Sequence, residues 1–94
     1  MRTRVARAPR QKQGKLDEAK QLHERARNVY EAVHGPDHPD VALACSNIAG
    51  VHFQRGETAE AKPLFERALT IRSSALGPDH PQTKSSADLA GKCA

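Results

Sequence analysis

The chain has 94 residues, of which 37% are hydrophobic and 28% are charged, and its formal net charge is +4. This length is enough for one small domain. With no Trp, one Tyr and two Phe it cannot build an aromatic core. No apolar run approaches the roughly 20 residues that a membrane-spanning helix needs, so we expect no membrane span.

The positive charge is concentrated in the first 13 residues, MRTRVARAPRQKQ. This segment has five basic residues and no acidic one, whereas residues 14–94 have ten Lys or Arg and eleven Asp or Glu. Val5 is its one sizeable apolar side chain, so its burial does not offset the entropy lost on ordering. We therefore expect residues 1–13 to form a disordered basic tail and residues 14–94 to form the folded domain.

The tail has two further interpretations. An Arg-rich start without acidic residues is a feature of transit peptides. Its charge would also attract nucleic acid or an anionic surface. Aromatic residues for base stacking are missing from it, so nucleic acid is the less favoured partner.

The two cysteines, Cys45 and Cys93, stand 48 positions apart, which fits no metal-binding or redox motif. The chain also starts without the apolar segment of a secretory signal. We expect both thiols to be free, in the reducing environment of the cytoplasm.

An internal repeat with a period of 42 residues organises the chain. The segment GKLDEAKQLHERARNVYEAVHGPDHP (14–39) matches GETAEAKPLFERALTIRSSALGPDHP (56–81) at 13 of 26 positions. The residues that follow are also related, DVALACSNIA (40–49) to QTKSSADLA (82–90), with the second copy one residue shorter. The repeat copies start at Gly14 and Gly56, and two copies of one helical hairpin account for the chain after residue 13.

Hydrophobic periodicity predicts helices over 15–34, 40–55, 57–76 and 82–93. In the first helix the apolar residues occupy one arc of the helical wheel, which predicts one buried face formed by Leu16, Ala19, Leu22, Ala26, Val29, Tyr30 and Val33. The segment 40–55 has two adjacent apolar stripes, typical of a helix between two neighbours. The last helix has only Leu89 and several alanines, so we expect it to be weakly packed.

The block GPDHP, at 35–39 and again at 77–81, separates the helices. Gly35 and Gly77 suit the left-handed position that ends a helix, and the following prolines prevent its continuation. Pro39 and Pro81 suit the first position of the next helix, where no N–H is needed.

The pattern G-x-x-x-E-A-x-x-L-x-E-R-A, followed by G-P-D-H-P and N-[IL]-A, resembles the 42-residue tetratricopeptide (TPR) repeats of the kinesin-light-chain type. The resemblance covers about residues 14–91. It implies an all-α fold of four helices in antiparallel hairpins, a short right-handed α-solenoid fragment whose concave face binds peptides or proteins. The chain departs from the family pattern where His52 replaces a usual Tyr and Cys45 a usual Leu.

The predicted function is therefore that of a protein–protein interaction adaptor or scaffold. On the helix 40–55, polar and small residues lie opposite the apolar stripe, and the resemblance implies that Asn47 pairs with the backbone of a bound peptide. Asp88 is the matching residue of the last helix if the one-residue deletion is aligned correctly. The candidate groove residues are Leu43, Ser46, Asn47, Gly50, Gln54 and Asp88. Two alternatives stay open: a structural piece of a longer or self-associating repeat array, and a binder of nucleic acid or anionic surfaces through the tail.

Catalytic, cofactor and metal sites are not expected. The chain has no nucleophile elbow and no glycine-rich phosphate loop. His34 and His38 are four residues apart, but Gly35 and Pro36 interrupt the segment between them, so the two imidazoles are not expected to share a helix face. A loop or capping role is the preferred interpretation of both histidines.

Overall fold

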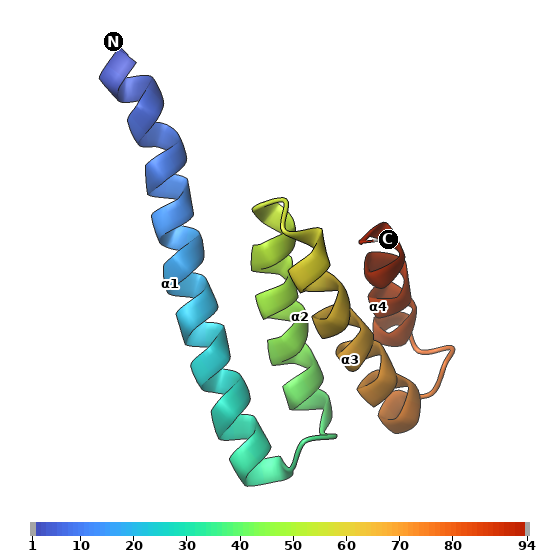
Figure 1. Ribbon diagram of the computed structural model, residues 1–94. Coiled ribbons are helices and arrows are strands. Elements are labelled where there is room, and N and C mark those ends of the chain that lie inside the picture. Colours follow the sequence, from blue (N-terminus) through green and yellow to red (C-terminus); the bar gives the residue numbers. More distant parts are fainter. Residues whose placement is uncertain (1, 94) are drawn as a thin grey trace.

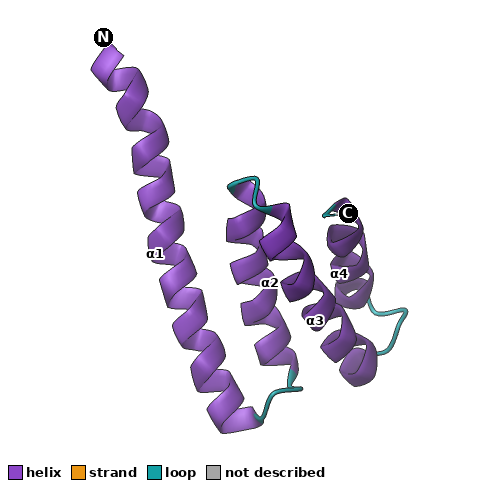
Figure 2. Cartoon of the chain, in the orientation of Figure 1, coloured by secondary structure: helices purple, strands orange, loops and turns teal. Residues whose placement is uncertain are grey.

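The computed structural model describes the backbone of residues 2–93 and the side chains of residues 14–93. It consists of four helices, α1 (Arg2–His34), α2 (Pro39–Gln54), α3 (Thr58–Leu76) and α4 (Pro81–Lys92). They lie in chain order, each packed against the next, with short loops between them (Figures 1 and 2). The expected all-α hairpin architecture is confirmed, and the predicted helix bounds agree to within one residue except at the start of α1.

The helix α1 is longer than the periodicity predicts. It begins at Arg2 and therefore runs through residues 2–13, where the composition predicts disorder. Arg, Ala, Lys and Gln are good helix formers, and they make up most of this segment. The segment extends beyond the end of α2 (Figure 1), and its side chains lie outside the described residues. The domain boundary at residue 13 stays a prediction.

None of the helices in residues 2–93 combines the length and the apolar character that crossing a membrane requires.

The two GPDHP loops have the same local structure, as the repeat predicts. Gly35 and Gly77 have φ angles of +88° and +92°, which L-residues with side chains rarely adopt. His38 and His80 are the N-cap residues of α2 and α4, and each Nδ1 accepts a hydrogen bond from the backbone N–H two residues on, at 3.0 Å and 3.2 Å. The loop or capping role preferred from the sequence is thus confirmed for His38 and His80, with an imidazole in place of the usual hydroxyl or carboxylate.

The helix α2 forms the centre of the fold because it packs against α1 on one side and α3 on the other. Its two apolar stripes confirm the expectation of a sandwiched helix. Val41, Ala42 and Cys45 join Ala68 and Ile71 of α3 in one apolar cluster. In a second cluster, Ala49 of α2 meets residues from both α3 and α4: Ala61, Phe65, Ala90 and Cys93.

The turn between α2 and α3 is held by polar contacts. Gly56 has a φ angle of +78°. The ring N–H of His52 donates to Glu57 Oε1 at 2.9 Å, and this hydrogen bond holds the pKa of the Glu57 carboxyl below its usual value. His52 thus lies at the end of the apolar stripe, as a half-buried residue with a polar partner.

The helix α4 packs against α3 through small and polar residues, and the expectation that it is weak stays a prediction. Thr83, Ser86 and Ala90 are its buried residues. Arg72 of α3 is also buried, donates to Ser86 Oγ at 2.8 Å, and has its pKa lowered by desolvation. The contact between α3 and α4 therefore includes the buried guanidinium group of Arg72.

We predict that Ala68→Leu destabilises the fold. Ala61 and Ala68 are fully buried, as their recurrence in both repeat copies suggests. A larger side chain at residue 68 would overpack the contact between α2 and α3 and lower the free energy of unfolding by about 1–3 kcal/mol. Glu66→Ala, on the exposed side of the same helix, is the control and should change stability little. Denaturant unfolding of both variants measures the difference, and equal losses would contradict the packing.

We also predict that the Cys45 thiol is protected from alkylation in the folded protein. Cys45 is fully buried, and this burial raises the pKa of its thiol. Because the thiolate is the reactive form, alkylation at pH 7 should be slow until the chain unfolds, and at a pH of about 8.5 its rate should still be below that of an exposed thiol. The Cys93→Ser variant isolates the signal of Cys45 in a timed iodoacetamide assay. Equal rates in buffer and in denaturant would argue against a buried thiol.

Candidate protein-interaction surfaces

One side of α1 is apolar and uncovered. Leu22, Val29 and Val33 have 62%, 53% and 69% of their surface exposed, and we call these three residues the α1 face. The sequence analysis predicted that they belong to one buried face with Tyr30, and the structure corrects this. The predicted arc is divided: Tyr30 packs against the core cluster on α2, whereas the α1 face points away from it. Among the described helices only α2 makes extensive contact with α1, so the other edge of its arc stays open.

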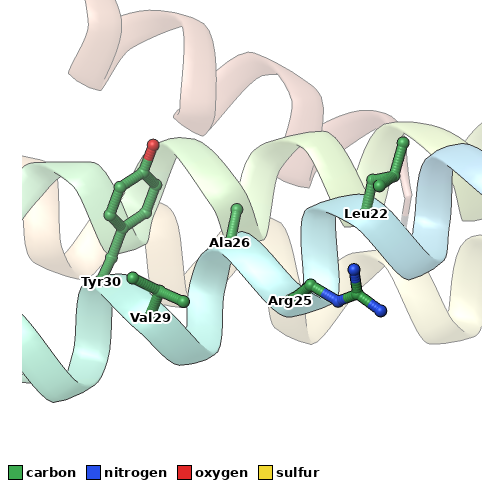
Figure 3. A pocket seen from close by; sticks show the side chains of 5 residues that line it. All are labelled: Leu22, Arg25, Ala26, Val29 and Tyr30. Carbon is green, nitrogen blue, oxygen red and sulfur yellow. The ribbon is translucent and has the colours of Figure 1, made fainter.

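Two adjoining shallow depressions lie on the surface of α1 at the α1 face. The first has a volume of about 300 Å³ and is formed by Leu22, Arg25, Ala26, Val29 and Tyr30, all on α1 (Figure 3). The second has a volume of about 230 Å³ and adds Glu18 and Gln21 to Leu22 and Arg25. The surface thus has an apolar centre with both signs of charge at one end, which is the usual composition of a protein interface.

The internal repeat shows what covers such a surface elsewhere in the chain. A shift of 42 residues places Leu22 on Leu64 and Val29 on Ile71. In α3, Ile71 is only 4% exposed and packs with Val41, Ala42 and Cys45 of α2, and Leu64 packs against the same cluster. The uncovered part of α1 therefore corresponds to the part of α3 that holds the preceding helix.

Ion pairs join the polar residues of α1 to α2 and α3. Arg55 at the end of α2 pairs with Asp17. Arg67 of α3 pairs with Glu31 at 2.9 Å, and it donates to the backbone oxygen of Pro36 at 3.4 Å. Because these contacts hold α1 on the side of α2 and α3, the α1 face stays directed outward.

The groove residues predicted from the sequence lie on α2, apart from Asp88 on α4. Leu43 and Gln54 are exposed, and Ser46, Asn47 and Gly50 are partly buried. A Cβ added at Gly50 would meet no neighbouring atom within 4 Å, so this part of the helix has free space above its backbone. The Ser46 Oγ is buried and makes no hydrogen bond among the described residues.

Asp88 is exposed on α4, but the structure gives it a different match in the repeat. Both helices start at equivalent prolines 42 residues apart, Pro39 and Pro81, and α4 is an uninterrupted helix. No residue is therefore skipped within it, and Asp88 corresponds to Ser46 rather than to Asn47. The deletion assumed in the sequence alignment would turn the rest of the helix by about 100°.

The uncovered α1 face was missed because periodicity shows that a helix has an apolar side but not how many neighbours share that side. A usable signal was present. Residues 1–13, before the helix predicted over 15–34, are mostly polar and basic, whereas the counterpart helix 57–76 follows the apolar segment 40–55.

The tetratricopeptide-repeat family model matches residues 10–72 and again residues 40–94. The two matches together span most of the chain, and the four helices have the hairpin arrangement of such repeats. The chain belongs to the tetratricopeptide-repeat family. Repeats of this family generally mediate protein–protein interactions, and the family is a repeat module without catalytic activity of its own. No curated protein matches the chain.

Proposed function

We propose that the chain is an adaptor module that binds a protein partner on the α1 face. The observation that carries this proposal is the difference between the two repeat copies: Leu64 and Ile71 pack against α2, whereas Leu22 and Val29, at the same repeat positions, are exposed. Monomeric soluble proteins rarely expose contiguous apolar patches, so an exposed apolar surface with a charged edge indicates an interaction site.

The matched partner for the α1 face is an amphipathic helix with small apolar residues. On α2 the residues that meet α3 are mainly Ala42, Cys45 and Ala49, which permit the helices to approach closely. A helix with the same pattern, supplied by another protein or by a further repeat, fits the equivalent positions on α1 in the same way.

This proposal predicts a loss of binding for Val29→Glu. A labelled peptide of residues 38–56, which contains α2, serves as the probe because it reproduces the helix that covers the equivalent positions of α3. Burial of one Val or Leu side chain contributes about 1.5–3 kcal/mol, so the variant should bind the peptide tenfold or more weakly. Fluorescence anisotropy measures the affinity.

Asn28→Glu is the matched control, since residue 28 is exposed and lies about 100° around the same helix from Val29. It introduces the same charge one position away and should leave the affinity for the peptide unchanged. Equal affinities of the two variants would overturn the assignment of the α1 face.

A second candidate surface is the polar groove on α2, on the concave side expected for the family. We infer that it would bind an extended peptide through Asn47, whose amide offers both a donor and an acceptor. Two observations support this: the unpartnered Ser46 Oγ beside it and the open space above Gly50. Leu43, Gln54 and Asp88 would lie at the edges of this groove.

The groove predicts that Asn47→Ala and Gly50→Arg weaken a partner isolated by affinity capture. An unpaired backbone group in the groove costs about 1–3 kcal/mol, so Asn47→Ala should lose roughly 5- to 150-fold in affinity. Gly50→Arg would fill the groove sterically, and we expect both variants to keep the melting temperature of the wild type. Isothermal titration measures the affinity, and thermal unfolding followed by circular dichroism measures the melting temperature. Deleting residues 1–13 should leave the affinity nearly unchanged at about 150 mM salt, because charges beyond about 8 Å are screened.

The same variants separate the alternative functions. If the tail deletion abolishes retention of the partner, or of RNA or DNA, while the groove and α1 variants have no effect, the electrostatic function of residues 1–13 replaces the adaptor proposal. If the wild type self-associates and Val29→Glu makes it monomeric, the α1 face stacks on a second copy, as in a longer repeat array. Sedimentation velocity measures this.

We further infer that the repeats are of the kinesin-light-chain type, that the protein has no enzymatic activity and that it acts in the cytoplasm. The 42-residue period and the duplicated GPDHP block support the first inference. The family membership supports the second, and the two free thiols support the third.

A further inference from the structure

Three side chains with metal-binding atoms come together in the loop between α1 and α2. His34 is the last residue of α1, His38 caps α2, and Asp40 lies in the first turn of α2. Asp40 Oδ2 is 3.5 Å from His34 Nε2 and 3.7 Å from His38 Nδ1. The two imidazole rings stack with their centroids 4.2 Å apart.

This geometry corrects one premise of the sequence analysis. Gly35 and Pro36 do interrupt the helix between the two histidines, but they do not separate the side chains. With a φ angle of +88°, Gly35 reverses the chain, and the reversal places His38 against His34. The two imidazoles therefore converge across the loop rather than along one helix face.

We propose that His34, His38 and Asp40 bind a divalent transition-metal ion such as Zn²⁺. One ligand atom from each residue lies within 4.8 Å of the other two. Two imidazole nitrogens and one carboxylate oxygen are ligands of Zn²⁺ and its neighbours in the first transition row, whereas Mg²⁺ and Ca²⁺ prefer oxygen alone. Three protein ligands leave a position for water.

Binding requires a small rearrangement of the loop. In the structure, the lone pair of His38 Nδ1 accepts the N–H of Asp40 at 3.0 Å. A metal ion at the cluster takes over this lone pair, so the hydrogen bond is lost and the ring turns out of its stack with His34. The Asp40 N–H is then free to bond to water at the exposed end of the helix.

The second GPDHP loop shows that the turn itself does not need this cluster. There the positions of His34 and Asp40 are occupied by Leu76 and Gln82, and His80 alone caps α4 with the same backbone geometry. The capping histidine is thus common to both loops, and the other two ligands are particular to the first. These differences also supply substitutions that the repeat already tolerates.

Zn²⁺ titration of the full chain tests the proposal. We expect the wild type to bind one Zn²⁺ per chain by isothermal titration calorimetry, with no binding of Mg²⁺ at the same concentration. His34→Leu and Asp40→Gln introduce the residues of the second loop. Loss of a group that only supports a metal ligand already weakens binding by about tenfold or more, so each of these variants, which loses a ligand itself, should weaken Zn²⁺ binding at least that much. His80→Gln is the matched control and should bind as the wild type does.

Two further measurements distinguish this site from other metal-binding groups. In NMR spectra, Zn²⁺ should shift the imidazole signals of His34 and His38 and the amide signal of Asp40, but not the signals of His80. Zn²⁺ should also raise the melting temperature of the wild type, and not that of a His34→Leu, Asp40→Gln double variant.

Two results would overturn the proposal. One is an equal loss of affinity in His80→Gln, which would show that single surface histidines bind the metal. The other is full Zn²⁺ affinity in the double variant, which would assign the metal to other groups such as the thiols of Cys45 and Cys93.

Discussion

The fold depends on the close contact between α2 and its two neighbours. On α2 this contact is formed by the small side chains of Ala42, Cys45 and Ala49, so α3 approaches closely. On α3 it is formed by Ala61 and Ala68. Packing between small residues leaves little space to adjust. The small residues therefore set the spacing between α2 and α3, and α1 forms its ion pairs with these two helices.

A second consequence of this frame is that α1 and α3, the equivalent helices of the two repeat copies, differ in their surroundings. α3 holds α2 with Leu64 and Ile71 and holds α4 with Phe65 and Arg72, so both edges of its apolar arc are occupied. α1 has the same type of arc, but among the described helices it makes extensive contact with α2 alone. Repeats of this kind bury their apolar surface only by stacking, and the exposed α1 face follows from that rule. The surface proposed for binding is thus chemically the same as the interior of the stack.

The sequence predicted the repeat, the four helices and the fully buried alanines because each leaves a local mark: a period, a helix-ending Gly-Pro pair or an apolar stripe. It did not predict which part of an apolar arc is covered. Leu22 and Leu64 are both leucines at the same position of the repeat, and they differ only in their neighbours. It also separated His34 from His38, since spacing along a chain does not describe how a loop reverses. The polar groove on α2 was placed from the helical wheel alone, and its role in binding stays a prediction.

The exposed edges of the outer helices also give the chain a direction. At the positions of Ala42, Cys45 and Ala49, where α2 meets the next helix, α4 has Lys84, Ala87 and Gly91, and all three are exposed. A further helix packed there would meet the Lys84 ammonium group, which would have to stay in water or find an acidic partner. The α1 face also has a charged side chain beside it, Arg25, but its own residues are the large apolar side chains of Leu22, Val29 and Val33. The two ends of the stack therefore offer different surfaces, large apolar side chains on α1 and small or charged ones on α4, and the first GPDHP loop follows directly after α1.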